Sequence, residues 1–215
     1  NFMTPAWMDL IHSLAGVDIK VDGEENLWSH RPAVFIFNHR NNFDALIIGK
    51  LLRTDFTGVA KKELERHPIM GPAGRLMKVA FIDRGDAKKA VETMKPIMEL
   101  AKEGISIAIA PEGTRAKTLD LLPFKKGAFR IAMSAGIPIV PVIIRNADDI
   151  GSRDAFFMRP GTVEVTVLPP ISVADWTLDD LEERIDAVRD LFVATLADWP
   201  NGGRKLLGLK TRRRK

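Results

Sequence analysis

The chain has 215 residues, of which 46% are hydrophobic and 28% charged, a composition typical of one globular domain with a sizeable core. It has no cysteine, which excludes disulfides and thiolate metal sites, and its four histidines lack metal-ligand spacing, so no metal site is expected. The net charge of +4 comes from residues 204–215, which hold seven Lys or Arg and no acid. A nucleic-acid-binding surface is therefore not expected.

The N-terminal region predicts a helix over residues 4–15 and a strand over 17–21. Thr4-Pro5 can begin the helix, apolar residues recur at helical spacing, and Gly16 ends it. This helix either docks on the core or lies on a membrane surface. Docking is favoured because its polar face has no basic stripe.

Strands and helices alternate along the rest of the chain. Strands are expected over 33–37, 56–60, 79–82, 105–110, 137–145 and 162–168, and helices over 45–52, 86–103, 127–135 and 177–197. Pro96 should kink or split its helix, and two prolines should place the strand at 137–145 near an edge or delay its start.

This alternation predicts an α/β fold: a single layered domain with a largely central mixed sheet flanked by helices. The domain is expected over residues 1–200, with a basic tail over 201–215. No apolar run approaches the roughly 18 residues of a membrane span, so no transmembrane span is expected in this chain.

The first candidate site follows the strand at 33–37. His39 comes at the end of this strand, and Asp44 follows five residues later at the start of the next helix. If residues 40–43 form a turn, the Asp44 carboxylate can hold one nitrogen of the imidazole and leave the other as a base. The alternative is a His that caps the local turn and an Asp that caps the helix.

Basic residues also follow other strands. Lys61-Lys62, Arg84 and Arg115 each come where a strand is expected to end. Ligands of open α/β sheets bind beyond the carboxyl ends of the strands, so this placement indicates a ligand site. The alternative for Arg84 is an ordinary surface ion pair with Asp83 or Asp86.

The segment Pro111-Glu112-Gly113-Thr114-Arg115 ends the buried strand at 105–110. Gly113 lets the backbone approach a ligand closely, and the forked Arg115 guanidinium suits a phosphate. Glu112 is expected to hold either Arg115 or a substrate hydroxyl. The alternative is a Pro-Gly turn with an internal Glu112–Arg115 pair. The position at the end of a buried strand favours the functional interpretation.

In order and spacing, these segments resemble the four motifs of the glycerolipid acyltransferase family. The matching segments are Asn38-His39 with Asp44, Phe81-Ile82-Asp83-Arg84, Pro111-Glu112-Gly113-Thr114-Arg115 and Ile137-Pro138-Ile139-Val140-Pro141-Val142. The segment at 61–64 with Pro68 and Gly71 resembles the branch that acylates lysophosphatidic acid, and the one at 122–129 also resembles the family. The resemblance implies acyl transfer from acyl-CoA, or an acyl carrier protein, to the free hydroxyl of lysophosphatidic acid, giving phosphatidic acid without a cofactor.

The resemblance also implies roles for single residues. His39 would be the general base, oriented by Asp44. Arg84 and Arg115, with Lys61 or Lys62, would bind the phosphate, and Asn38, Glu112, Gly113 and Thr114 would contact the substrate. There is no Cys and no GxSxG segment, which favours direct attack over an acyl-enzyme.

Lipid substrates imply a membrane surface as partner and an association with the cytoplasmic face of a membrane. The basic tail either helps to bind an anionic leaflet or is a disordered solubilising segment. Three other functions stay open: acylation of glycerol-3-phosphate or another lysophospholipid, a metal-dependent phosphoesterase built on Asn38-His39, and a non-catalytic membrane lipid-binding module. Intact His39 and Asp44 disfavour the last.

Overall fold

The computed structural model describes residues 3–66, 74, 79–82, 87–116, 118 and 120–199. Its sheet has seven strands in the order β1-β7-β6-β2-β5-β3-β4. The strands are β1 (Val17–Asp22), β2 (Val34–Phe37), β3 (Phe56–Lys61), β4 (Ala80–Ile82), β5 (Ser106–Ile109), β6 (Ile139–Ile144) and β7 (Gly161–Val167). Among the described ladders, β6–β7 alone is antiparallel, so the sheet is mixed, as predicted.

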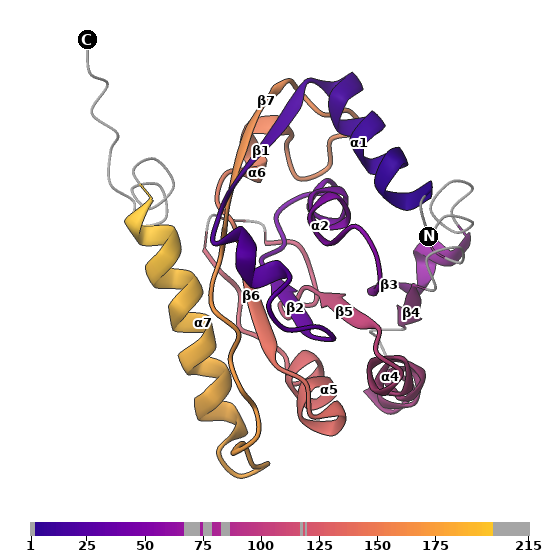
Figure 1. Cartoon of the computed structure of the whole chain (residues 1–215), viewed down its shortest axis with the longest axis vertical. Helices are drawn as coiled ribbons and strands as arrows, with labels where there is room; N and C mark the ends of the chain where they lie inside the picture. Colours follow the sequence, from indigo (N-terminus) through magenta and orange to yellow (C-terminus); the bar gives the residue numbers. More distant parts are fainter. Residues whose placement is uncertain are drawn as a thin grey trace.

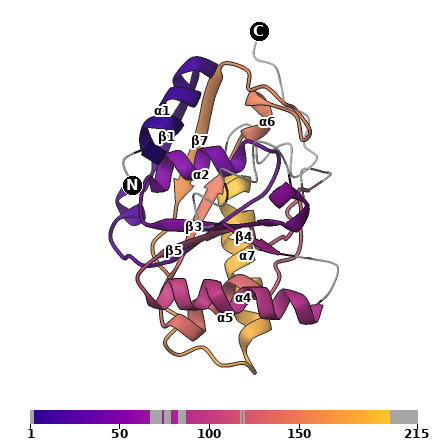
Figure 2. The same cartoon turned by 90° about the vertical axis from the view of Figure 1, so that its right-hand side faces the viewer.

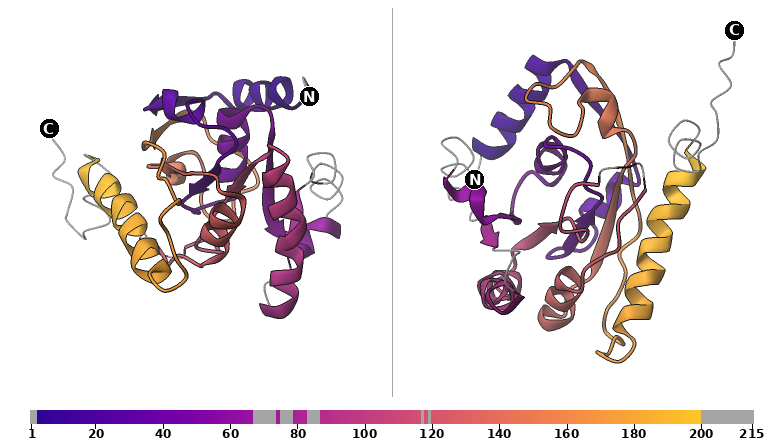
Figure 3. Two further views of the ribbon diagram at one scale, coloured as in Figure 1. Left: turned by 60° about the horizontal axis from the view of Figure 1, so that its bottom comes forward. Right: turned by 180° about the vertical axis from the view of Figure 1, so that it is seen from behind.

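Helices cover both faces of this sheet (Figures 1 and 2). One face carries α1 (Met3–Ala15), α2 (Asp44–Leu52) and α6 (Ala147–Ile150); the other carries α4 (Ala87–Lys102), α5 (Gly127–Ala135) and α7 (Leu181–Asp198). Short 3-10 helices follow β1 (Glu24–Leu27) and β3 (Lys62–Arg66). The α7 helix lies on the far side of the molecule from α1 (Figure 3). The predicted layered α/β class is confirmed.

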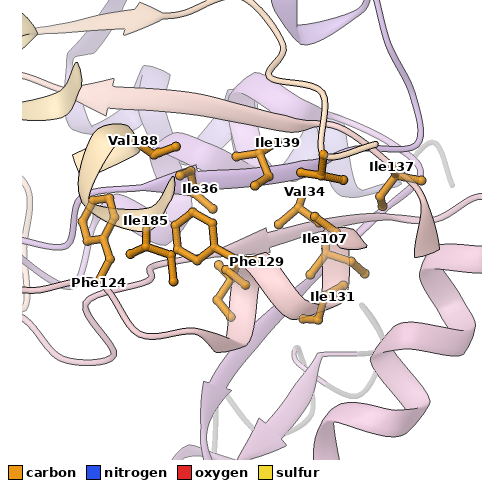
Figure 4. Close-up of a cluster of buried hydrophobic side chains, with 14 of the residues drawn as sticks. Val34, Ile36, Ile107, Phe124, Phe129, Ile131, Ile137, Ile139, Ile185 and Val188 are labelled. Atoms are coloured by element: carbon orange, nitrogen blue, oxygen red, sulfur yellow. The ribbon is translucent and has the colours of Figure 1, made fainter. Parts of the chain in front are cut away.

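The strand β2 shows why the sheet is central. All four of its residues are buried, because successive side chains of a strand point to opposite faces and helices cover both faces of this sheet. Val34 and Ile36 join the cluster beneath α5 and α7, where Figure 4 shows them beside Phe129 and Ile139. Phe35 enters the cluster on the opposite face. Each such fully buried side chain contributes about 1.5–3 kcal/mol relative to exposure, so this segment is fixed firmly where the site begins.

The structure excludes one of the two alternatives predicted for each proline-containing element. The strand β6 begins late, at Ile139, as one alternative had it, but it lies between β2 and β7 rather than near an edge. The carbonyl of Pro141 accepts the Leu168 N–H at 3.0 Å, so its missing N–H faces the segment just before the β6–β7 ladder starts at Val142. Pro141 and Leu168 continue the register of this ladder, but Pro141 supplies only the acceptor of the two bonds that such a pair can exchange, so the described ladder begins one residue later. The helix α4 continues through Pro96, so it is not split.

The N-terminal helix docks on the core, as favoured. Met8 is buried against Gly49 of α2, and His12 is buried with its Nδ1 2.7 Å from the Met8 carbonyl oxygen. The opposite face exposes Trp7, Leu10 and Leu14. None of the helices in the described ranges combines the length and apolarity that crossing a membrane requires.

The sheet brings five strand ends to one edge. Strands β4, β3, β5, β2 and β6 are neighbours and run in the same direction. The segments that follow their carboxyl ends therefore meet on one side of the sheet, which is where such folds bind ligands. The segments after β2 and β5, which carry two of the four motifs, follow adjacent strands.

Candidate active site

His39 and Asp44 form a hydrogen-bonded pair at the end of β2. Nδ1 of His39 lies 2.8 Å from Oδ2 of Asp44, the first residue of α2. Because a carboxylate only accepts hydrogen bonds, Nδ1 carries the proton, and Nε2 of the neutral ring is then an acceptor. The Asp44 side chain is fully buried, whereas that of His39 is 23% exposed. The carboxylate is thus fixed inside the protein, and the imidazole remains accessible to a ligand.

The turn between the two residues is built by backbone N–H groups. Oδ2 of Asp44 accepts the N–H of Arg40 at 2.6 Å and that of Asn41 at 2.9 Å. The side chain of Asn41 accepts the Phe43 N–H and donates to the carbonyls of Ala147 and Gly151. These bonds produce the turn over residues 40–43 that the pairing requires. The spacing of one His and one Asp predicted the pair, and Asn41 was missed because the two carbonyls to which it donates lie over 100 residues away.

Asn38 lies inside the protein rather than facing the sheet edge. Its Oδ1 accepts the Ile144 N–H and its Nδ2 donates to the Ile144 carbonyl, both at 2.8 Å. The amide therefore replaces a pair of ladder bonds at the end of β6. Asn38 was expected to contact substrate; its described bonds instead join the end of β2 to β6 and fix the backbone entering His39.

Glu112 also differs from its expected contacts. Its Oε1 accepts the backbone N–H of His39 at 2.7 Å, and its Oε2 accepts the backbone N–H of Leu122 at 3.0 Å. The side chain is buried, and this burial raises the pKa of Glu112, while the two backbone bonds act in the opposite direction. Neither oxygen pairs with Arg115 in these bonds. The carboxylate joins the segment after β5 to the one after β2, beside the base.

Arg115 lies against the same turn. Its Nη1 donates to Oδ1 of Asn42 at 2.8 Å and to the Arg153 carbonyl, and its Nη2 lies 3.0 Å from Oδ1 of Asp154. The N–H of the next residue, Ala116, donates to the His39 carbonyl at 3.0 Å. The structure therefore places the Arg115 guanidinium close to the His39 turn, and that guanidinium already holds a carboxylate.

Gly113 is required by its backbone and by a neighbour. Its φ is +71°, and a Cβ there would lie 2.9 Å from both Cε and Nζ of Lys125. The exposed Lys125 is a cation beside the motif that was not among the predicted site residues. Its position in the segment 122–129, which resembles the family, was the signal that would have found it. Thr114 is exposed next to Gly113.

Lys61 and Lys62 are the remaining predicted cations whose backbone the structure describes. Lys61 ends β3 and pairs in register with Ile82, and Lys62 is exposed at the start of the following 3-10 helix. Arg84 and the side chain of Lys61 lie outside what the structure describes. The strand β4 is three strands from β2, about 14 Å at the usual spacing. Within the described part of the chain, no three His, Asp or Glu side chains are grouped as metal ligands.

Comparison with known proteins matches the same segments of the chain. The family model described as Acyltransferase matches residues 18–145, which include the His39 turn and the segment with Arg115. The 1-acyl-sn-glycerol-3-phosphate acyltransferase of Saccharomyces cerevisiae is 37% identical over 188 residues, 86% of this chain and 62% of that protein. The enzymes of the same name from Limnanthes douglasii and Salmonella typhimurium are 34% and 32% identical, over 87% and 86% of this chain and 66% and 75% of theirs.

The chain belongs to the acyltransferase family, as these matches demonstrate. It spans slightly less than two thirds of the Saccharomyces and Limnanthes douglasii proteins. A crystal structure of the 1-acyl-sn-glycerophosphate (LPA) acyltransferase PlsC from Thermotoga maritima has a TM-score of 0.73 and 22% identity, over 92% of this chain and 80% of that one. That likeness confirms the fold.

Proposed function

We propose that this chain transfers a fatty acyl group from acyl-CoA, or from an acyl carrier protein, to the free hydroxyl of lysophosphatidic acid, which gives phosphatidic acid. The observation that carries the proposal is the His39–Asp44 pair with the Arg115 guanidinium beside its turn. The names of the relatives support the same acceptor.

His39 is the general base of the proposed reaction. Nε2 takes the proton of the acceptor hydroxyl while that oxygen attacks the thioester carbonyl. The new C–O bond forms, the C–S bond breaks, and the protonated imidazole returns its proton to the leaving thiolate. The buried Asp44 carboxylate holds Nδ1–H and stabilises the imidazolium that forms between these steps. Proton transfer of this kind contributes about 10²–10⁴-fold to a rate.

Arg115 is the phosphate-binding residue for which the described contacts give most support. The acceptor phosphate replaces the Asp154 carboxylate on Nη2, while Asn42 and the Arg153 carbonyl keep hold of Nη1. Lys61 and Lys62 supply further positive charge from the end of β3, and Arg84, which follows β4 in the sequence, adds to it. Fixing the phosphate positions the hydroxyl against His39, and such positioning is a large part of catalysis with two substrates.

Both proposed substrates are amphiphiles, so the partner of the protein is a membrane surface, on its cytoplasmic face. The exposed Trp7, Leu10 and Leu14 of α1 fit this setting, since aromatic and aliphatic side chains favour the membrane interface. Asn38 and Glu112 support the site through their hydrogen bonds to backbone groups, and Gly113 through its positive φ beside Lys125.

Release of free CoA tests the proposal. The purified chain is given acyl-CoA with lysophosphatidic acid, with glycerol-3-phosphate, or with no acceptor. We expect CoA release that depends on lysophosphatidic acid and survives EDTA. Equal release with glycerol-3-phosphate would assign the alternative acceptor, and release of phosphate in place of CoA would indicate a phosphoesterase. Lipid binding without release of either product would overturn the enzymatic proposal.

A further inference from the structure

The segment 151–160, between α6 and β7, carries two adjacent aromatic side chains that point away from the protein. Phe156 is 88% exposed and Phe157 87%, more than any other large hydrophobic side chain in the described part of the chain. Large apolar side chains exposed side by side indicate an interaction site. We call this segment the 151–160 loop.

The loop is anchored on both sides of the aromatic pair. Ala155 and Met158 pack against the hydrophobic core, and the Arg159 N–H donates to the Ile150 carbonyl at 2.7 Å. At its start, Gly151 lies so close to the Phe43 ring that an added Cβ would come within 2.3 Å of it. With the residues before and after them held in place, Phe156 and Phe157 project outwards.

The same loop is bonded to the candidate active site. Its Gly151 and Ala155 carbonyls accept hydrogen bonds from Asn41 and Asn42, both in the turn between His39 and Asp44. Its Asp154 is the carboxylate held by Arg115. Since a chain extends at most about 3.6 Å per residue, the Phe156 Cα lies within about 7 Å of the Asp154 Cα.

We propose that the 151–160 loop is a membrane-docking element, in which Phe156 and Phe157 insert into the surface of an anionic bilayer. The inference rests on the proposed function, whose acceptor and product are both anionic lipids. Arg153 and Arg159 flank the pair, and Asp154, the single carboxylate of the loop, is shared by Arg115 at 3.0 Å and Arg153 at 4.0 Å, so cations outnumber it. The loop therefore presents aromatic rings between cations, a composition that favours the head-group region of anionic membranes.

This docking places the head-group site at the membrane surface. The loop lies at the same end of the molecule as α1, whose outer face is also apolar (Figures 1 and 2). A lipid that leaves the bilayer beside the aromatic pair meets Arg115 first, because Arg115 is bonded to the loop. The phosphate is thus captured while the acyl chain is still close to the membrane.

The test compares the full chain with the double variant Phe156→Ser/Phe157→Ser in co-sedimentation with vesicles. The vesicles are phosphatidylcholine alone or phosphatidylcholine with phosphatidic acid. The matched control is Leu178→Ser: Leu178 is 72% exposed, in the segment leading into α7 at the opposite end of the molecule (Figure 1). Thermal unfolding confirms that each variant is folded.

We expect the parent chain to prefer the anionic vesicles. The double variant should bind them at least about tenfold more weakly, since two phenyl side chains are withdrawn from an apolar environment. Leu178→Ser should bind like the parent. Unchanged binding by the double variant would overturn the proposal, as would an equal loss in Leu178→Ser. After either outcome, binding to a protein partner would remain as the explanation for the exposed pair.

A second measurement separates docking from catalysis. CoA release is measured with lysophosphatidic acid in vesicles and with a short-chain analogue below its micellar concentration. We expect the ratio of vesicle to monomer turnover to fall in the double variant and to stay constant in Leu178→Ser. An equal loss with both acceptors would place the two rings in the acyl site and overturn the proposal. Phe-dependent vesicle binding without any turnover would refute the proposed function and leave the docking element standing.

Discussion

The backbone N–H of His39 donates to the buried Oε1 of Glu112 at 2.7 Å, which joins two segments 73 residues apart in the chain. The second oxygen of the same carboxylate accepts the Leu122 N–H. Glu112 therefore acts as a positioning residue, because it fixes the backbone from which the imidazole projects while Asp44 fixes the ring itself.

Removal of this carboxylate should affect both stability and turnover. Glu112→Ala leaves the partly buried N–H groups of His39 and Leu122 without their charged acceptor, at up to about 3 kcal/mol of unfolding free energy for each. Because the imidazole is then misplaced, kcat should fall more than KM rises. Urea unfolding and CoA-release kinetics measure the two effects. The control is Glu103→Ala at an exposed position after α4, which should change neither. A wild-type kcat in Glu112→Ala would contradict the positioning role.

The raised pKa of Glu112 gives stability a specific pH dependence. Burial raises this pKa above 4.5, so the folded chain keeps the proton to a higher pH than the unfolded chain. Where the folded state binds more protons, the unfolding free energy falls as pH rises, until the folded pKa is passed. Glu112→Gln cannot ionise. The stability of the wild type relative to Glu112→Gln should therefore decline from pH 4.5 upwards and then become constant, as measured by urea unfolding at a series of pH values. A stability difference that rises with pH would refute the raised pKa of Glu112.

Asp154 should compete with the substrate phosphate for Arg115. Asp154→Asn removes a charge from a pair that is partly exposed to solvent, a pair worth up to about 1 kcal/mol. The KM for lysophosphatidic acid should therefore fall by up to about fivefold, with a smaller change in kcat. Arg115→Gln should raise the same KM by about tenfold or more, as loss of a charged hydrogen bond does. Asp175→Asn, at another exposed position, is the control. A higher KM in Asp154→Asn would mean that Asp154 orients Arg115 rather than competing with phosphate.

Two glycines with positive φ separate backbone strain from crowding. Gly113 and Gly104 have φ of +71° and +93°, but a Cβ would meet Lys125 at Gly113 and nothing within 4 Å at Gly104. Alanine at either position should lower the unfolding free energy by about 1–2 kcal/mol through left-handed strain. Gly113→Ala should also reduce kcat/KM, because Lys125 and the segment carrying Arg115 must move. Equal activities of the two variants would show that the approach of Lys125 has no effect on the site.

The sequence was most informative where a function depends on neighbours along the chain. The spacing of His39 and Asp44 predicted their pairing, and buried apolar runs such as residues 34–37 predicted the strands. The sequence could not predict contacts to distant backbone groups. Asn38 bonds to Ile144 and Glu112 to His39, and both contacts depend on which strands become neighbours, which no local pattern specifies.

Pro141 makes the same point for the fold. The prolines in this strand predicted either an edge position or a late start, because proline lacks a ladder donor. The structure places Pro141 in a central strand, one residue before the antiparallel ladder with β7 begins. A strand can therefore hold a proline inside the sheet where its missing N–H falls at the end of a ladder.

The most direct test of the central claim is the rate of CoA release, with acyl-CoA and lysophosphatidic acid, by His39→Ala and by the matched control His30→Ala. His30 is exposed, and its ring contacts Ser29. If the imidazole held by Asp44 is the general base, His39→Ala should fold, bind lipid and lose about 10²–10⁴-fold in kcat, with His30→Ala unchanged. Turnover by folded His39→Ala at the parent rate would contradict the account.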